Sequence, residues 1–220
     1  MINKTPPRPR KLPKQSRSQI LVNAIQEACL QILHSGGAEQ LSTQNIADVA
    51  GVNIASVYQY FPNKDAVLAS VYDKELQYLA DLTAERFADI HAMSERTLEG
   101  TLGAIIDLEA DQLVVLYKLN PDFYVQYNRS YDVHSAVDEK TQSMQNPSWK
   151  DWFPDFLSIH KNRLRSDDIG TLSFIARNTM RGVLQAALDE DPGLLASETF
   201  RAEILTVLLR YLVDDAHSSQ

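Results

Sequence analysis

Apolar residues recur at three- and four-residue steps along most of the chain, the spacing that places them on one face of a helix. The first such stretch begins at Ser16 or Ser18 and ends at the glycine pair 36–37, because glycine enters the left-handed conformation that closes many helices. Pro154 is expected either to start a helix or to kink one, since proline has no N–H to donate. The spacing predicts further helices over 43–50, 53–60, 64–93, 95–119, 169–189 and 199–213, with interrupted helices over 121–144 and 147–165. No alternating strand pattern is found, so the sequence predicts an all-α fold.

The charge of the chain is unevenly distributed. The net charge is −8, yet residues 1–64 hold seven Lys or Arg against three Asp or Glu, a net of +4, so the other 156 residues carry −12. Such asymmetry is typical of a basic nucleic-acid-binding element on an acidic body. Six basic residues precede the first acidic one, Glu27: Lys4, Arg8, Arg10, Lys11, Lys14 and Arg17.

Four prolines lie among these basic residues, at positions 6, 7, 9 and 13. This composition cannot pack into a core, so we expect residues 1–15 to form a flexible, extended arm. A run of charge is also typical of a solvated tail. The arm is therefore interpreted as a nucleic-acid contact only because a DNA-reading module follows it.

Residues 41–67, LSTQNIADVAGVNIASVYQYFPNKDAV, have the pattern of two short helices joined by a tight turn. Ser42 is placed to cap the first helix and Asn53 the second, and Gly51 permits the turn between them. The second helix has barely two turns and requires its neighbours for stability. A helical hairpin with no nucleic-acid role is the alternative interpretation of this segment.

The residues from Thr43 to Asp65 resemble the DNA-binding signature of the TetR family, T-x-x-I-A-x-x-A-G-V followed by V-Y-x-Y-F-P-x-K-D. The resemblance implies an N-terminal three-helix helix-turn-helix domain and a C-terminal helical domain for dimerisation and ligand binding. We accordingly expect a basic flexible arm at 1–15, the helix-turn-helix domain at 16–62 and the ligand-binding and dimerisation domain at 63–220. The implied function is a repressor that binds a palindromic DNA operator as a homodimer.

The resemblance also implies which residues contact DNA, since such a module lays its second helix in the major groove. Phosphate contacts are expected from Thr43, Tyr58 and Lys64, and backbone or minor-groove contacts from Lys14 and Arg17. Gln44 is expected at a base or a phosphate. Base contacts are expected from Ile54, Ala55, Ser56, Gln59 and Tyr60. Ile54 and Tyr60 depart from the residues common in the family, and Tyr60 is alternatively expected to pack on the first helix.

The two last helices are apolar around much of their circumference, which predicts a dimer interface or, alternatively, a deeply buried monomer core. On the first of these helices, an interface stripe recurs at three- and four-residue spacing: Leu172, Ile175, Thr179, Gly182 and Ala186. Residues 117–156, which precede these two helices, are rich in aromatic residues. Such a concentration is typical of either a protein core or a ligand pocket. We expect this region to bind a small, largely apolar or aromatic effector. The expected ligand-binding residues are Tyr124, Tyr127, Tyr131, Trp152 and Phe156. The alternative is a DNA-binding protein of the same fold that is controlled by a protein partner or acts without a small-molecule inducer.

Other classes of function find little support. The sequence has no HExxH, GxSxG, phosphate-binding glycine loop or Cys/His metal spacing, so we expect no enzyme, no cofactor and no metal. No run of apolar residues is long enough to cross a membrane, and no secretory signal is found, so we expect a cytoplasmic protein. The single cysteine, Cys29, is interpreted as a buried apolar residue, with a redox switch as the alternative.

Overall fold

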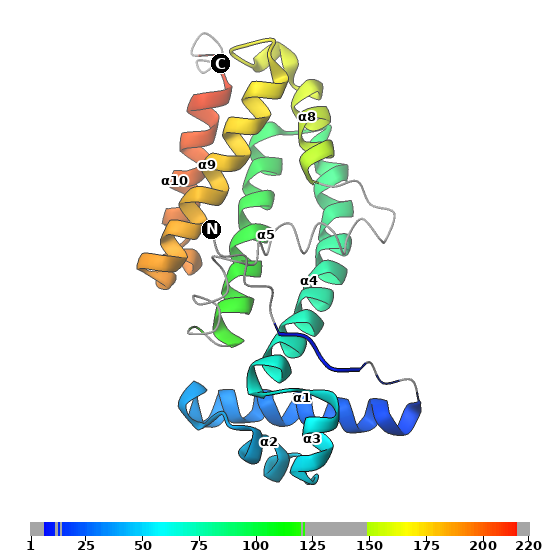
Figure 1. The fold of residues 1–220 in the computed structure, drawn as a ribbon. Helices are drawn as coiled ribbons and strands as arrows, with labels where there is room; N and C mark the ends of the chain where they lie inside the picture. The colour runs from blue at the N-terminus through cyan, green and yellow to red at the C-terminus, as the bar shows by residue number, and fades with distance from the viewer. Residues whose placement is uncertain (1–6, 12, 14, 120, 122–148, 215–220) are drawn as a thin grey trace. The chain divides into compact units, whose positions relative to one another are not determined.

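The computed structural model describes residues 7–11, 13, 15–119, 121 and 149–214 (Figure 1). The expected all-α fold is confirmed: in the part of the chain that the structure describes, the β pairing is one isolated bridge between Leu164 and Val213. The α-helices are α1 (Ser16–Gly36), α2 (Thr43–Val49), α3 (Ile54–Tyr60), α4 (Lys64–Ser94), α5 (Leu98–Leu119), α8 (Trp149–Ile159), α9 (Ile169–Glu190) and α10 (Glu198–Leu212). Short 3₁₀ turns are η1 (Ala38–Gln40), η2 (Lys161–Arg163) and η3 (Pro192–Ala196).

The chain divides into two compact units. The N-terminal unit comprises residues 1–78 and 116–136, and the C-terminal unit comprises residues 79–115 and 137–220. The division falls within α4, after Tyr78, whereas the helix-turn-helix domain is expected to end at residue 62. The helix itself continues without a break from one unit into the other.

The N-terminal unit is built around α1. The apolar face of this helix buries Ile25, Cys29 and Ile32 completely or almost so, and the helix packs against α2. A polar contact joins it to α4: the Gln26 amide nitrogen donates to Ser70 Oγ at 3.1 Å. Burial raises the pKa of the Cys29 thiol to about 12. This environment favours the interpretation of Cys29 as an apolar core residue, because reactive cysteines need an accessible thiolate.

The C-terminal unit has α5 at its centre, with Leu102, Ile105 and Leu113 fully buried. The sequence predicts that α5 begins at Glu95, but it begins at Leu98 because Thr97 acts as the cap: the Gly100 N–H donates to Thr97 Oγ1 at 3.2 Å. The preceding residues form a turn, in which the Thr97 N–H donates to the carbonyl of Met93.

Pro154 lies inside α8, five residues after the helix begins. The expectation that it starts a helix is therefore wrong. Proline deprives the carbonyl four residues earlier, that of Lys150, of its helical donor. Lys150 is itself exposed, so water can satisfy this carbonyl.

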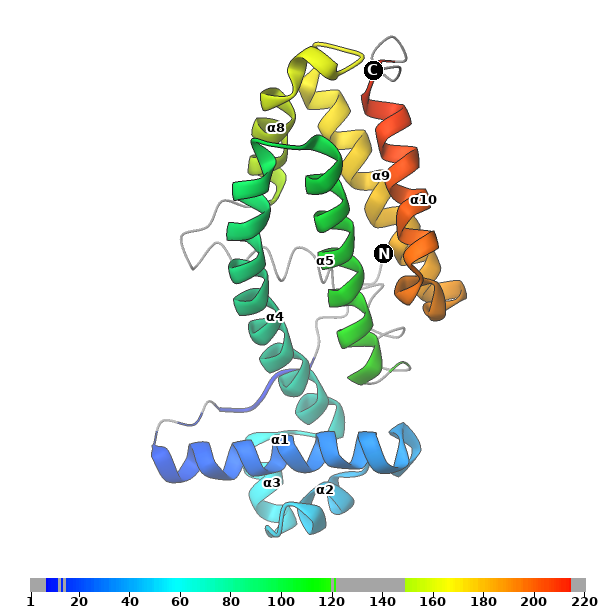
Figure 2. The same ribbon diagram turned by 180° about the vertical axis from the view of Figure 1, so that it is seen from behind.

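The last two long helices, α9 and α10, pack together and lie side by side in both views (Figures 1 and 2). Each begins with a side-chain cap: Asp168 accepts from the Thr171 N–H at 3.0 Å, and Ser197 accepts from the Phe200 N–H at 3.3 Å. Leu184 of α9 and Leu208 of α10 are both buried in the core of this unit. Leu172, which the sequence pattern groups with the exposed interface stripe, is instead buried in this core.

Candidate nucleic-acid interface

The helix-turn-helix forms as the capping residues predict. Ser42 Oγ accepts from the Asn45 N–H at 3.1 Å and starts α2, whose inner side buries Ile46 and Ala47. Gly51 follows with φ +66°, a left-handed conformation that L side chains rarely adopt. A Cβ at this position would meet nothing within 4 Å. The backbone angle, and not crowding, is therefore what favours glycine in the turn.

Helix α3 has seven residues and depends on its surroundings for stability. Asn53 Oδ1 accepts from the Ala55 N–H at 2.8 Å at its start. Val57 and Tyr60 anchor its inner side in the core of the N-terminal unit, with Val57 fully buried. The helix is thus held in place by one cap and two buried side chains.

The outer side of α3 faces solvent. Ala55, Tyr58 and Gln59 are exposed, with 41% of the Tyr58 surface accessible. Ile54 and Ser56 are half-buried at its edges. These five residues, expected at bases or phosphates, occupy the side of α3 that a DNA groove could receive. Their contacts with DNA remain a prediction.

The residues expected at phosphates flank this surface within the N-terminal unit. Thr43 is half-buried at the first position of α2, where main-chain N–H groups favour an anion. Gln44 is exposed, and its amide donates to Asp48 Oδ1 at 2.8 Å. The exposed Lys64 donates from Nζ to the carbonyl of Leu41 at 3.0 Å. Lys64 must therefore leave or share this contact to neutralise a phosphate.

Of the two expected arm contacts, Arg17 is exposed in the first turn of α1. Lys14 lies outside the described residues.

Tyr60 does not display its ring to solvent. Only 6% of its surface is accessible, so the expected base contact gives way to the alternative of a packed side chain. The cause is its position on α3: Tyr60 follows Val57 by three residues and so shares its inward face.

The N-terminal arm is attached to this same tyrosine, a contact that the sequence analysis does not predict. The Arg10 N–H donates to the Tyr60 carbonyl at 2.7 Å, and Lys11 Nζ lies 4.7 Å from the centroid of the Tyr60 ring. Proline-rich basic composition indicated an extended arm without a fixed position. The sequence did contain one signal for this contact. Tyr60 ends α3 at a position where the resembled signature often has histidine, and an aromatic ring can bind a cation.

Two of the expected ligand-binding residues lie in the core of the C-terminal unit. Trp152 and Phe156 are buried and stacked, with ring centroids 5.3 Å apart, and Phe87 packs edge-on against Trp152 at 5.1 Å. Their burial and stacking fit aromatic core packing, and a ligand contact at either residue stays a prediction. Tyr124, Tyr127 and Tyr131 lie outside the described residues.

A groove of about 670 Å³ lies elsewhere in the C-terminal unit, between α5 and the start of α10, with Arg86 of α4 at one side. Its size is in the range of small-molecule sites, roughly 300–1,000 Å³. Both charged and apolar side chains line it: Arg86, Gly103, Ile106, Asp107, Asp111, Val114, Ala196, Glu198, Arg201, Ala202 and Leu205.

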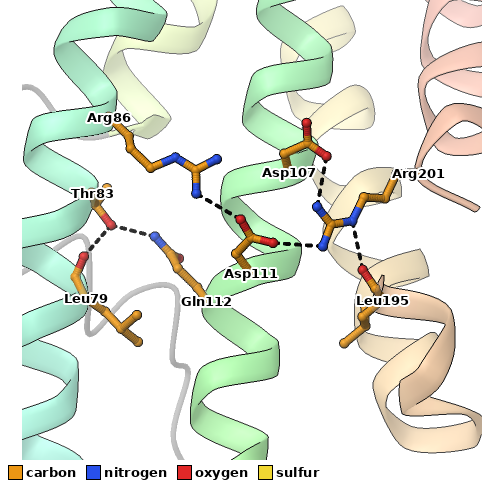
Figure 3. Close-up of polar contacts among 8 residues, drawn as sticks. All are labelled: Leu79, Thr83, Arg86, Asp107, Asp111, Gln112, Leu195 and Arg201. Atoms are coloured by element: carbon orange, nitrogen blue, oxygen red, sulfur yellow. Dashed lines mark hydrogen bonds and ion pairs between the residues drawn. The ribbon is translucent and has the colours of Figure 1, made fainter. Parts of the chain in front are cut away.

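Arg201 organises the polar part of this groove (Figure 3). Its guanidinium donates to Asp107 Oδ1 at 3.0 Å, to Asp111 Oδ1 at 2.8 Å and to the Leu195 carbonyl at 2.8 Å. Arg86 donates to the second oxygen of Asp111 at 3.0 Å. A second contact, from Gln112 to Thr83 Oγ1 at 2.5 Å, joins α5 to α4 nearby. The two arginines and two aspartates of this groove are therefore paired with one another, and Glu198 adds a third carboxylate to the lining.

Exposed apolar side chains mark another surface of this unit. On α9 they are Phe174, Ile175 and Val183, and on α10 Val207, with accessibilities from 37% to 63%. Gly182 and Ala186, from the predicted interface stripe, are exposed on α9 as well. An apolar face of this kind on two adjacent helices is typical of an interaction surface.

The described residues contain no group of three or more His, Cys, Asp or Glu side chains that could hold a metal ion. None of the helices in the described ranges combines the length and apolar character needed to cross a membrane.

Comparison with known proteins identifies both parts of the chain. Residues 25–71 match the family model of bacterial regulatory proteins of the tetR family. Residues 101–212, more than half of the chain, match the tetracyclin repressor-like C-terminal domain. The search of curated proteins found no match.

Solved structures share the fold at low sequence identity. A protein assigned to the TetR family from Mesorhizobium loti MAFF303099 is 15% identical, with a TM-score of 0.56 over 91% of this chain and 100% of that one. A TetR-family regulator from Streptomyces coelicolor is 24% identical, with a TM-score of 0.51 over 89% and 97%. SmeT, the repressor of a Stenotrophomonas maltophilia multidrug efflux pump, is 18% identical, with a TM-score of 0.50 over 91% and 92%. With the helix-turn-helix geometry and both family models in agreement, the chain belongs to the TetR family of transcriptional regulators.

Proposed function

We propose that this protein is a transcriptional repressor that binds a palindromic DNA operator as a homodimer and is released by a small ligand. The observation that carries the proposal is the presentation of α3. This helix is capped by Asn53 and anchored by Val57, and it exposes Ala55, Tyr58 and Gln59. Gln59 can pair with adenine through two hydrogen bonds, and Ala55 allows close approach of a base.

The homodimer follows from the size of the reading surface. A helix of seven residues meets only a few base pairs, so two copies on a two-fold axis are needed to specify a longer, palindromic site. The exposed apolar residues of α9 and α10 support this assembly, because a self-complementary helical face would cover them in a second copy.

The release step requires that a ligand bind one conformation better than another, since only differential affinity shifts an equilibrium. Continuous helix α4 supplies a mechanical link, as it runs from the DNA-binding unit into the unit that contains the groove. We retain a largely apolar or aromatic effector as the proposed class. The apolar walls of the groove, Ile106, Val114 and Leu205, support a contact with such a molecule.

The proposal is tested by selecting duplexes from a random DNA library with the full chain and measuring the affinity of the selected operator. We expect a palindromic sequence. Replacing Gln59 with alanine should weaken binding by about tenfold or more, since a good base contact contributes about 1–3 kcal/mol. Tyr58→Ala should also weaken binding, through the loss of the expected phosphate contact. Tyr78→Ala is the matched control, because Tyr78 is also an exposed tyrosine but lies on α4. Failure to enrich any sequence would refute the function.

Ligand control is tested separately on the same operator. Small apolar and aromatic compounds are added to the preformed complex, and release of the DNA is followed by fluorescence anisotropy. Release by such a compound supports the repressor mechanism. If only a protein from the host releases the complex, the alternative of control by a protein partner is correct.

A further inference from the structure

We infer that Tyr60 anchors the basic arm, so that Arg8 and Arg10 form a second DNA-contacting element at the C-terminal end of α3. The inference rests on the proposed function, because it assumes that α3 reads DNA. It assigns Tyr60 a role as a positioning residue in place of the direct base contact expected from its sequence position.

Two contacts of different kinds hold the arm at this point. The main-chain N–H of Arg10 donates to the Tyr60 carbonyl at 2.7 Å. Tyr60 is the last residue of α3, and carbonyls in the last turn of a helix lack partners within the helix. The arm thus satisfies a group that would otherwise need water. The second contact is the Lys11 ammonium over the Tyr60 ring, with the centroid 4.7 Å away.

The burial of Tyr60 makes it a firm support. Only 6% of its surface is accessible, so the ring is already fixed in one conformation in the folded unit. Prolines 9 and 13 flank the attached residues and restrict the backbone on both sides. A restricted arm loses less conformational entropy on attachment than a glycine-rich arm would. The described part of the arm accordingly turns back from the first residues of α1 (Figures 1 and 2).

The attached segment presents positive charge that is not neutralised. Arg8, Arg10 and Lys11 are exposed, and no acidic residue precedes Glu27 in the chain. Within the described ranges, the side chains of Arg8 and Arg10 have no hydrogen bond or ion pair. Their guanidinium groups are free to bind phosphates, for which their planar donor geometry is well suited.

The position of the anchor indicates where this charge would act. A reading helix directs its N-terminal residues at base edges, so its C-terminal end lies towards the rim of the major groove. The anchored arginines would therefore meet the sugar-phosphate backbone bordering the sequence that α3 reads. An unanchored arm would supply the same charge without a fixed place, and its contribution would not depend on Tyr60.

A double-mutant cycle on the selected operator tests this dependence. The full chain is compared with Tyr60→Leu, with the double variant Arg8→Ala/Arg10→Ala, and with the triple combination, across a salt series. We expect the arginine variant to weaken binding by about tenfold or more and to lower the logarithmic salt slope by about 2, since each phosphate contact contributes near 0.9. Tyr60→Leu removes the ring contact with Lys11 and keeps the main-chain carbonyl that accepts from Arg10, so it should reproduce part of both effects. The triple variant should bind no more weakly than the arginine variant alone.

Tyr60→Phe is the conservative control, because it retains a ring for the Lys11 ammonium, and it should keep the wild-type affinity and salt slope. Should Tyr60→Leu fail to fold, Lys11→Met and Lys11→Arg replace it in the cycle, as Lys11 is exposed and contributes only its cation to the ring contact. Lys11→Met should then mimic loss of the anchor, and Lys11→Arg should restore it.

The inference is overturned if the anchor and arginine variants weaken binding independently, so that their fold-changes multiply, or if removal of the two arginines leaves affinity and salt slope unchanged. Neither result affects the proposed function. If the wild-type chain itself enriches no operator, the proposed function fails first, and the two failures are thus distinguishable.

Discussion

Asn53 accepts a hydrogen bond from the Ala55 N–H at 2.8 Å and thereby caps the helix that carries the expected base contacts. A cap matters most in a short helix, where one hydrogen-bonded N–H is a large share of all the hydrogen bonds that the helix makes. We expect Asn53→Ala to lower the free energy of unfolding by about 1 kcal/mol and to weaken operator binding as well. Asn53→Ser, which keeps a side-chain acceptor, should retain most of the stability and most of the operator affinity. Denaturant unfolding and DNA affinity measure the two effects, and equal behaviour of Ala and Ser would contradict the assignment.

Arg201 is the second residue whose removal should be costly, because it joins α10 to two carboxylates of α5 and to η3. Only 18% of its side chain is exposed. We expect Arg201→Met to destabilise the protein by about 1–2 kcal/mol, a value reduced for the partial exposure of its partners. Arg86→Met should cost less, since Arg86 makes one of these ion pairs and is more exposed. A thermal unfolding series ranks the two variants, and the reverse order would be inconsistent with the network.

The pair between Glu99 and Arg163 makes stability depend on acid pH. The hydrogen bond from Arg163 lowers the pKa of Glu99 from 4.5 to about 2. The folded state therefore favours the carboxylate, and the resulting stability is fully present above about pH 4.5 and lost as the pH falls towards 2. Glu99→Gln should make the midpoint of thermal unfolding depend less on pH over this window. Glu203→Gln, an exposed substitution on α10, serves as the control and should follow the wild-type profile.

The proposed dimer interface makes a prediction about assembly. Val207 on α10 has 51% of its surface exposed, so a charge placed there need not disturb the core of one copy. It would, however, be buried without a partner in a dimer. We expect Val207→Glu to sediment as a monomer at micromolar concentration and to lose operator affinity. Ile159→Glu, with 50% exposure on α8, should remain dimeric. A wild-type chain that sediments as a monomer would refute the interface.

Capping and turn residues account for most of what the sequence predicted correctly. Ser42, Gly51 and Asn53 act through their own backbone or within three residues, so a linear sequence contains the whole interaction. Asn63 acts over the same short range, since it accepts from the Ala66 N–H at 2.9 Å at the start of α4. Local chemistry therefore located the helix-turn-helix before any tertiary contact was known.

Interactions between distant segments could not be predicted in the same way. Arg201 and Asp111 are 90 positions apart, and no periodicity relates them. Apolar spacing shows that a helix has a buried face but not which neighbour covers it, which is why Leu172 was grouped with the interface stripe although it is buried within the unit. Tyr60 illustrates the limit most clearly. Its inward direction follows from that of Val57, but Arg10, which donates to its carbonyl, lies fifty positions earlier in the chain.

The burial of Cys29 has a practical consequence for labelling the protein at one chosen position. It is the one cysteine in the 220-residue sequence, and its side chain is inaccessible, with a thiol pKa of about 12. Maleimide reagents attack thiolates, so the native protein should be almost inert to them at neutral pH. A cysteine introduced on the outer side of α3 or α10 would then be the single labelled position, and fluorophore pairs in a dimer could report the spacing of the two DNA-binding units without first removing the native thiol.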